Sequence, residues 1–125
     1  MYKLNDLEVW KITRALRIKV STTCKKFPNE EKYRLFDQLI RSSRSVHNNI
    51  AEGFGRFHFQ ENIQFNRQAR GSLFETMDHL ICAYDEGYIN KKELDEYTIE
   101  FEKCLHKLNG YILYLKNAKQ STNNK

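Results

Sequence analysis

The sequence predicts an all-α protein, an antiparallel up-down four-helix bundle, on three observations. Apolar residues recur at three- and four-residue steps along four long segments, a spacing that places them on one face of a helix. The connections between these segments are short, which favours antiparallel neighbours. One proline and five glycines leave long stretches without a helix breaker. We expect a single domain over residues 1–119 and a flexible tail over residues 120–125, which has no apolar side chain to bury.

The first predicted helix runs from about Asp6 to Lys26. Asp6 is a suitable N-cap, and Pro28 prevents the helix from continuing. The apolar stripe of this segment consists of Leu7, Trp10, Leu16, Val20, Cys24 and Phe27.

The second predicted helix follows Asn29, which can cap the turn that starts at Glu30. We expect a break near Arg34 and a continuous helix from there to about Arg56. Its apolar stripe consists of Leu35, Phe36, Leu39, Ile40, Ser43, Val46, Ile50 and Phe54.

The third predicted helix spans residues 59–86, and the fourth spans residues 91–119. Gly87 suits the position after a helix C-cap because glycine adopts a left-handed conformation without a steric penalty. Asn90 and Glu93 have the spacing of a capping box, which marks the start of the fourth helix.

Residues 45–56 contain three choices that are unfavourable inside a helix. Asn49 competes with the backbone for hydrogen bonds, Glu52 faces the negative end of the helix dipole, and Gly53 costs about 1 kcal/mol relative to alanine. We infer that contacts with another helix require them. In the alternative, Gly53 and Gly55 simply end the helix and Glu52 is solvated.

A hairpin that turns near His58 supplies such contacts. It places Gly71 opposite Ser45 and Arg67 opposite Asn49, so that the small residues Gly71 and Ser72 permit a close approach. Arg67 then reaches Asn49 and Glu52. Five residues form this predicted structural motif: Asn49, Glu52, Gly53, Gly71 and Ser72.

The charge of the chain is unevenly distributed. The net charge is +5, with a pI of about 9.1. Residues 1–72 carry 14 Lys and Arg against 7 Asp and Glu, whereas residues 73–125 carry 7 against 9. A basic half favours a polyanionic partner, RNA or DNA, through the release of counterions.

Arginines are the predicted nucleic-acid-binding residues because their guanidinium groups contact phosphate in a bidentate manner. Phe57 and Phe59 lie in the turn between two helices and are candidates for stacking on exposed bases. In the alternative, Arg67 and Arg70 bind polar groups within the bundle and the two phenylalanines cap the core. The arginines are Arg14, Arg17, Arg41, Arg44, Arg56, Arg67 and Arg70.

Cellular location follows from what the sequence lacks. No run of about 18 apolar residues and no secretory signal is present, so we expect a cytoplasmic protein without a membrane partner. Cys24, Cys82 and Cys104 all fall on apolar stripes, which predicts buried, reduced thiols.

We expect no catalytic activity, no cofactor and no metal. Arg41 and His47 are six residues apart, similar to the pair in metal-independent ribonucleases of the helical HEPN class, and ribonuclease activity is therefore a remote alternative. Two histidines follow a glutamate by four residues, which is typical of surface pairs and differs from the Glu-x-x-His of di-iron bundles. The metal candidates considered are Glu75, His79 and Cys82 on one helix and Glu102 and His106 on the next.

Several strings resemble a bacterial family of four-helix bundles encoded in intervening sequences of 23S ribosomal RNA genes. They are DLEVW at residues 6–10, NIAEG at residues 49–53 and ARGSL at residues 69–73, and the resemblance covers residues 4 to about 115. The accessory variability protein of diversity-generating retroelements is similar to this family. The sequence departs from the family pattern at Ile40, Ser42, Ser43, Arg44, His47, His58, Asn62, Asn66 and Gln68.

The resemblance implies a ring-shaped homopentamer with a basic surface. In the retroelement relative, the partners are nucleic acid and a reverse transcriptase, so the resemblance also implies a nucleic-acid-processing protein as a partner. We therefore expect a non-enzymatic accessory protein that binds RNA or DNA. The alternative is a scaffold that binds other proteins and no nucleic acid.

Overall fold

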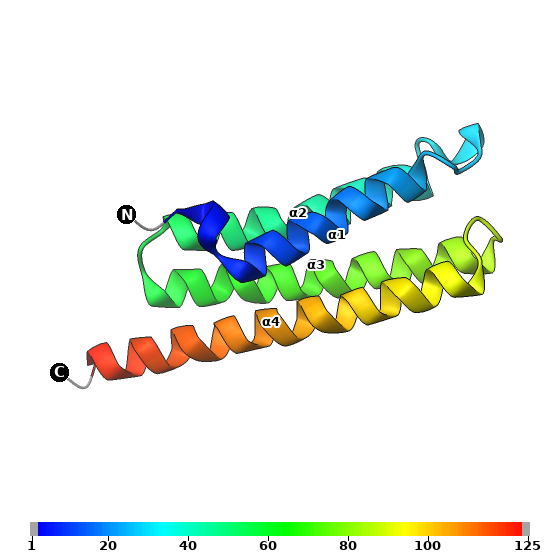
Figure 1. The fold of residues 1–125 in the computed structure, drawn as a ribbon. Helices are drawn as coiled ribbons and strands as arrows, with labels where there is room; N and C mark the ends of the chain where they lie inside the picture. The colour runs from blue at the N-terminus through cyan, green and yellow to red at the C-terminus, as the bar shows by residue number, and fades with distance from the viewer. Residues whose placement is uncertain (1–2, 124–125) are drawn as a thin grey trace.

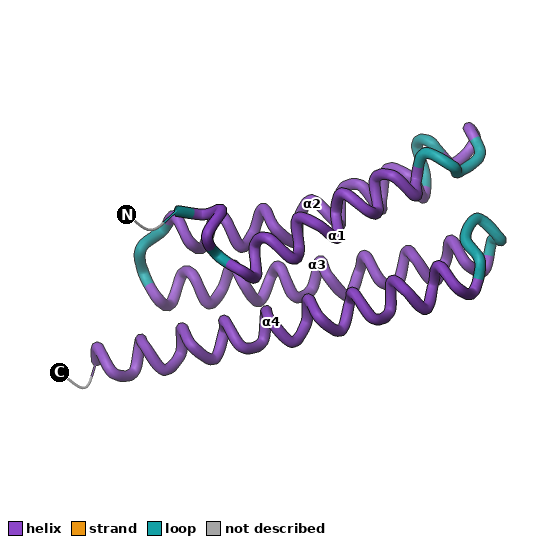
Figure 2. The backbone as a smooth tube through the Cα atoms, viewed as in Figure 1, coloured by secondary structure: helices purple, strands orange, loops and turns teal. Residues whose placement is uncertain are grey.

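A computed structural model describes residues 3–123, and it forms an antiparallel up-down bundle of four helices (Figure 1). Two short 3₁₀ turns, Leu4–Asp6 and Asn29–Glu31, lie before the first helix and before the second. Figure 2 shows helices joined by short loops, with no strand in the described part of the chain. The predicted fold class is confirmed. The helices are α1 (Glu8–Cys24), α2 (Leu35–Gly55), α3 (Phe59–Asp85) and α4 (Lys91–Asn123).

The core lies where the four apolar stripes meet along the bundle axis. Val20, Leu39, Ile50, Leu73 and Leu108 each expose 1% of their surface or less, and they come from all four helices. Burial of such side chains is the main favourable contribution to folding. No helix in the described part of the chain is long and apolar enough to span a membrane.

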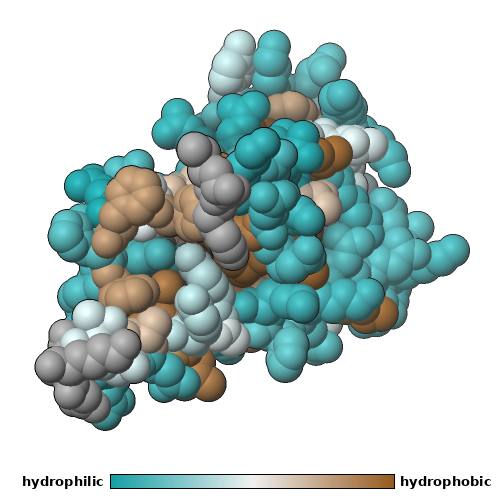
Figure 3. Space-filling model, turned by 60° about the vertical axis from the view of Figure 1, so that its left-hand side comes forward, coloured by the Kyte–Doolittle hydropathy of each residue, from teal (hydrophilic) through white to brown (hydrophobic). Residues whose placement is uncertain are grey.

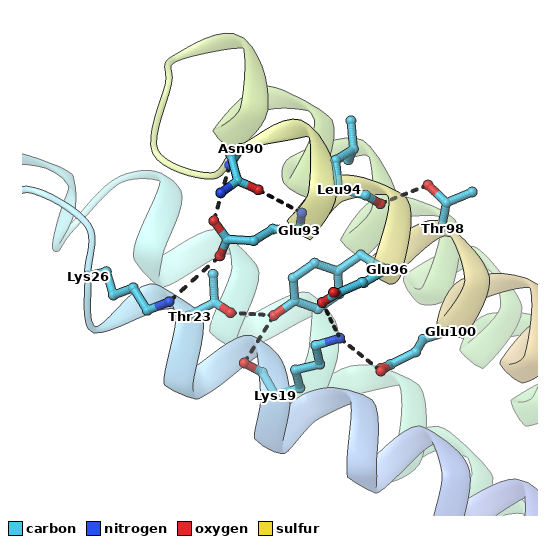
Figure 4. A network of polar contacts seen from close by, with 10 residues as sticks. Lys19, Thr23, Lys26, Asn90, Glu93, Leu94, Glu96, Thr98 and Glu100 are labelled. Atoms are coloured by element: carbon cyan, nitrogen blue, oxygen red, sulfur yellow. Dashed lines mark hydrogen bonds and ion pairs between the residues drawn. The ribbon is translucent and has the colours of Figure 1, made fainter.

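Polar side chains join α1 to α4 near the start of α4 (Figure 4). The hydroxyl of Tyr97 is 2.5 Å from Oγ1 of Thr23, and it donates to the carbonyl of Lys19. The ammonium of Lys19 also lies 2.9 Å from a carboxylate oxygen of Glu100. These bonds satisfy the polar end of a tyrosine that is 1% exposed, so the ring can fill the core.

Local signals set three of the helix ends as expected. The backbone N–H of Tyr88 donates to Ala83 and that of Gly87 to Tyr84, which closes α3 with Gly87 at φ +80°. Asn90 and Glu93 exchange the two hydrogen bonds of a capping box at the start of α4. The break near Arg34 is also present, with α2 starting at Leu35.

Three predicted helix ends differ from the structure. Asn29 lies within the second 3₁₀ turn, which has Pro28 at its N-cap position and no side-chain cap, so the predicted cap at Asn29 was wrong. Asp6 lies within the first 3₁₀ turn and Leu7 occupies the N-cap position of α1, without a side-chain cap, so the prediction for Asp6 was wrong. Helix α4 continues to Asn123, beyond the expected end at Lys119. The remainder of the expected tail, residues 124–125, lies outside the described residues.

The register between α2 and α3 differs from the predicted one by a single residue. Oγ of Ser45 lies 2.8 Å from Oγ of Ser72, and one turn away Thr76 donates to Ser42 over 3.0 Å. Gly71 is exposed and has open space around it, so the close approach expected there was wrong. Small hydroxyl side chains, which bond one another, fill this part of the interface.

The close approach between the two helices is at Gly53 instead. A Cβ atom at this position would lie 2.7 Å from Oδ1 of Asn62 and 3.0 Å from Cβ of Phe65. Gly53 therefore lets α3 pack against the last turns of α2. The glycine in the NIAEG string is explained by packing, and it does not end the helix, which continues to Gly55.

The three cysteines do not share one environment. Cys24 and Cys104 are buried, and burial raises the pKa of each thiol to about 12. Cys82 is exposed on the outer side of α3, so the prediction that it is buried was wrong. Local desolvation and the carboxylates of Asp78 and Asp85 raise its pKa, which disfavours the reactive thiolate.

Candidate nucleic-acid interface

His47 lies at the centre of a polar contact between α1 and α2. Its side chain is 8% exposed, and Nε of Arg17 donates a hydrogen bond to its Nε2 over 3.2 Å. The indole of Trp10 meets the imidazole edge to face, with ring centroids 6.3 Å apart. The guanidinium of Arg14 lies 5.7 Å from the centroid of the Trp10 ring. Two arginines of α1 are thus positioned beside a buried imidazole of α2.

Burial, followed in order of effect by the charges of Arg17, Arg14 and Arg44, lowers the pKa of His47 to about 4. The imidazole is therefore neutral at pH 7, and its Nε2 accepts the hydrogen bond from Arg17. The positive charge around His47 therefore comes from three guanidinium groups and not from the imidazole.

Arg41 lies one turn before Arg44 on α2, so the two side chains are neighbours on the helix surface. Nε of Arg41 is 3.0 Å from a carboxylate oxygen of Asp37, and its side chain is 80% exposed. Four of the seven predicted arginines thus lie on α1 and α2, three of them acting on His47 and the fourth one helical turn from Arg44. We call Arg14, Arg17, Arg41 and Arg44 the arginine cluster.

The other three predicted arginines lie elsewhere. Arg56 binds Glu52 over 2.8 Å and lies 3.7 Å from Glu61 at the end of α2. Arg70 donates to Oδ1 of Asn109 on α4 over 2.9 Å, and Arg67 is exposed on α3. Since Arg56 holds Glu52, the expected contact of Arg67 with that carboxylate was wrong.

Asn49 bonds within its own helix, so the expected contact with Arg67 was wrong. Its Nδ2 donates to the backbone carbonyl of Ser45 over 2.8 Å and to Oγ of the same residue over 3.0 Å. It therefore orients the hydroxyl that meets Ser72. Asn49, Ser45 and Ser72 form one chain of hydrogen bonds across the α2–α3 interface, and this role is structural.

A second surface feature lies at the end of the bundle where α2 turns into α3. Its groove has a volume of about 390 Å³. Figure 3 shows apolar surface gathered at this end of the molecule, between hydrophilic areas. We call it the aromatic groove, and its lining residues are Phe54, Gly55, Phe57, Phe59, Asn62, Tyr111, Tyr114 and Leu115.

Phe57 is the most exposed large apolar side chain of the groove, at 90%. The alternative reading, in which it caps the core, was wrong. Its φ of +60° is left-handed, a conformation that is unfavourable for a bulky residue. Phe59, at 37% exposed, lies beside it as the first residue of α3. The sequence pointed to both phenylalanines but not to the tyrosines of α4 that complete the groove.

The ribonuclease alternative has no support in this geometry. The side chain of Arg41 binds Asp37, whereas His47 contacts Arg17 and Trp10. A histidine with a pKa of about 4 is also a poor general acid or base near pH 7.

Two of the metal candidates, Glu75 and His79, form a pair on α3. Nε2 of His79 lies 3.4 Å from a carboxylate oxygen of Glu75, four residues earlier on α3. Among residues 3–123, no three His, Cys, Asp or Glu side chains are placed to hold a metal ion.

A family model for the 23S rRNA-intervening sequence protein matches residues 5–110. The chain belongs to this family. The match includes the whole arginine cluster but ends before Tyr111 and Tyr114, so one wall of the aromatic groove lies outside it. None of the curated proteins compared with the chain matches it.

A solved structure supports the fold of this member of the 23S rRNA-intervening sequence protein family. It is the crystal structure of a protein of unknown function from the S23 ribosomal protein family of Bacteroides thetaiotaomicron, at 1.70 Å resolution. The two chains are 20% identical and superpose with a TM-score of 0.76, over 83% of this chain and 94% of the other. At this level of identity, the likeness concerns the bundle alone.

Proposed function

We propose that this protein binds nucleic acid through the arginine cluster and that it has no catalytic role. The observation that carries the proposal is the arrangement around His47, where Arg17, Arg14 and Arg44 approach one neutral ring. Such an arrangement costs electrostatic energy in the free protein, and a bound phosphate would relieve it.

The fixed geometry of two of these arginines supports binding to phosphate. Arg17 is held by His47, and Arg14 lies over Trp10. Both side chains are therefore partly ordered before a ligand arrives, which lowers the entropy lost on binding. Asp37 is the carboxylate paired with the cluster, through Arg41.

RNA is the first ligand to test, because the family takes its name from intervening sequences of 23S rRNA.

The resemblance described above also supports assembly into a ring-shaped homopentamer. A ring would repeat the arginine cluster several times, so that a modest affinity per subunit becomes a strong one. A nucleic-acid-processing protein as a further partner, and a cytoplasmic location, belong to the same proposal.

The test is a fluorescence anisotropy titration with a structured fragment of ribosomal RNA and a DNA duplex of matched length, at two salt concentrations. Light scattering on the same samples reports the size of the particle. We compare the wild type with Arg14→Glu/Arg44→Glu and with a control, Lys92→Glu/Lys107→Glu, which changes the net charge equally. Lys92 and Lys107 are exposed on α4, away from the cluster.

We expect binding that weakens steeply with salt, because each phosphate contact releases counterions. The arginine variant should bind at least tenfold more weakly at low salt, and the lysine variant should stay close to the wild type. If both variants lost affinity equally, net charge alone would explain binding, and this result would contradict a specific site. Absence of binding at low salt would contradict the proposal altogether.

A protein scaffold is the second candidate, and the aromatic groove is the observation that favours it. Exposed apolar grooves commonly bind partner proteins. Capture of a protein by the wild type that Tyr114→Ala abolishes, together with RNA binding that is weak and insensitive to salt, would support the scaffold. Tyr114 is 63% exposed, so this change leaves the core intact.

A further inference from the structure

The position of α1 explains why a groove exists at this end of the bundle. Sγ of Cys104 on α4 contacts the carbonyl of Ile12 near the start of α1. Beyond this level, α4 continues to Asn123, whereas α1 begins only at Glu8 (Figure 1). The last turns of α4 therefore lack the neighbour that covers the rest of the helix, and the groove lies between them and the end of α2.

The lining of the groove is mainly aromatic. Five of its eight residues are Phe or Tyr, contributed by α2, the turn before α3, the first residue of α3 and α4. The rings of Tyr111 and Tyr114 are nearly parallel, with 11° between their planes and 6.2 Å between their centroids. Flat, exposed aromatic faces are the surfaces on which unpaired nucleobases stack.

Phe57 is held in the groove at a cost to the fold. It occupies the position after the C-cap of α2, where helices usually have glycine, and its φ is +60°. A left-handed conformation costs a residue with a Cβ atom about 1–2 kcal/mol. Burial offers no compensation because the side chain is 90% exposed. Such strain is typical of functional sites, where a ligand uses the exposed group.

The charges around the groove suit a polyanion. None of the eight lining residues is acidic. The nearest glutamates on α2 and α3, Glu52 and Glu61, both lie close to Arg56. Lys116 is exposed one residue after the groove residue Leu115, and Lys119 binds Gln60 across the end of the bundle. This rim favours nucleic acid over an apolar peptide.

The groove also lies within reach of the arginine cluster. His47 and Phe54 are seven residues apart on α2, which places them on the same helix face about 10 Å apart. One strand of nucleic acid carries about three phosphates over that distance. A strand of a few nucleotides is therefore long enough to reach from the cluster to the groove.

We propose that the aromatic groove binds an unpaired nucleobase, so that the protein prefers single-stranded or looped nucleic acid to a duplex. This inference rests on the proposed nucleic-acid binding and specifies the class of ligand. The amide of Asn62 is occupied on both sides, since Nδ2 donates to Tyr111 and Oδ1 accepts from Asn66. The aromatic rings of the groove therefore stack on a base without forming hydrogen bonds to its edge. The preference for single-stranded nucleic acid is then independent of base sequence.

The test compares a short fluorescent oligonucleotide with an abasic one that has the same number of phosphates. The protein variants are Phe57→Gly, Tyr114→Ala and, as a control, Tyr33→Ala. Tyr33 is 84% exposed in the connection between α1 and α2, at the opposite end of the bundle (Figure 1). The variant Phe57→Gly removes the ring and suits the left-handed backbone, so loss of folding does not confound the result.

We expect the wild type and Tyr33→Ala to bind the base-bearing oligonucleotide about tenfold more tightly than the abasic one. In Phe57→Gly and Tyr114→Ala this ratio should fall toward one, while affinity for the abasic strand stays unchanged. Equal affinity of the wild type for both strands, with retained salt dependence, would overturn the groove inference and leave the arginine cluster in place.

Two other results would also be decisive. Absence of binding to either strand at low salt would overturn the proposed function together with this inference. If Phe57→Gly instead lowered the mass measured by light scattering and left the ratio unchanged, the groove would be a contact between protein subunits. That outcome would also overturn base binding.

Discussion

Nε of Arg17 donates a hydrogen bond to Nε2 of His47 over 3.2 Å, and this contact defines the protonation state of the histidine. A protonated imidazole has no lone pair to accept that bond. It would also stand as a fourth cation beside Arg14, Arg17 and Arg44. The neutral ring thus joins α1 to α2 and, at the same time, orients one arginine of the candidate interface.

This relationship predicts a specific loss of stability in acid. The pKa of His47 is about 4 in the folded protein, against the 6.5 that is usual for histidine. Between these values the unfolded chain binds more protons, so stability is fully present above pH 6.5 and falls as the pH drops toward 4. The loss from this one group is at most roughly 3 kcal/mol.

Urea denaturation at several pH values between 7 and 4 measures that loss. The variant His47→Gln keeps an acceptor for Arg17 and does not titrate, so its stability should depend less on pH over this range. A proton NMR titration of the imidazole gives the folded pKa directly. A midpoint near 6.5 would contradict the buried, neutral histidine.

The contact at Gly53 predicts opposite effects for two glycine-to-alanine changes. A Cβ atom at Gly53 would meet Oδ1 of Asn62 at 2.7 Å and Cβ of Phe65 at 3.0 Å, so Gly53→Ala should destabilise the protein by about 1–3 kcal/mol. Gly71 has open space and lies inside α3, so Gly71→Ala should stabilise by about 0.5–1 kcal/mol. Thermal or chemical denaturation of both variants measures the difference, and effects of the same sign would contradict this register.

The backbone conformation of Phe57 predicts that the side chain proposed to bind a base also lowers the stability of the fold. Replacing Phe57 by glycine relieves a left-handed φ of +60° and removes little buried surface, since the side chain is 90% exposed. The variant should be more stable by about 1 kcal/mol. Denaturation measures the gain, and Tyr33→Gly serves as the exposed aromatic control. A less stable Phe57→Gly variant would show that the ring contributes to the fold.

Two neighbouring arginines of α2 should differ in their contribution to binding. Arg41 is paired with Asp37 over 3.0 Å, and a phosphate must compete with that carboxylate. The described residues give Arg44 no such acidic partner. In plots of log K against log salt concentration, Arg44→Gln should reduce the slope by about 0.9, and Arg41→Gln should reduce it less. The reverse order would indicate that Asp37 positions Arg41 for the ligand.

Much of the fold follows from short stretches of sequence. Gly87 ends α3, and Asn90 with Glu93 starts α4, because these residues bond backbone groups within one helical turn. The exposure of Arg14, Arg41 and Arg44 is equally predictable, since each falls outside the apolar stripe of its own helix. Such features depend only on the helical period and on local hydrogen bonds.

The sequence by itself determined four amphipathic helices, most of their ends and several arginines on their polar faces. Tertiary structure alone decided which residues of different helices contact one another. Arg17 meets His47 across 30 residues of sequence, and Gly53, not Gly71, marks the close approach of α2 to α3. Both outcomes depend on how each helix is rotated and shifted against its neighbour. Side-chain packing sets that register over the whole interface, and no single segment contains the information.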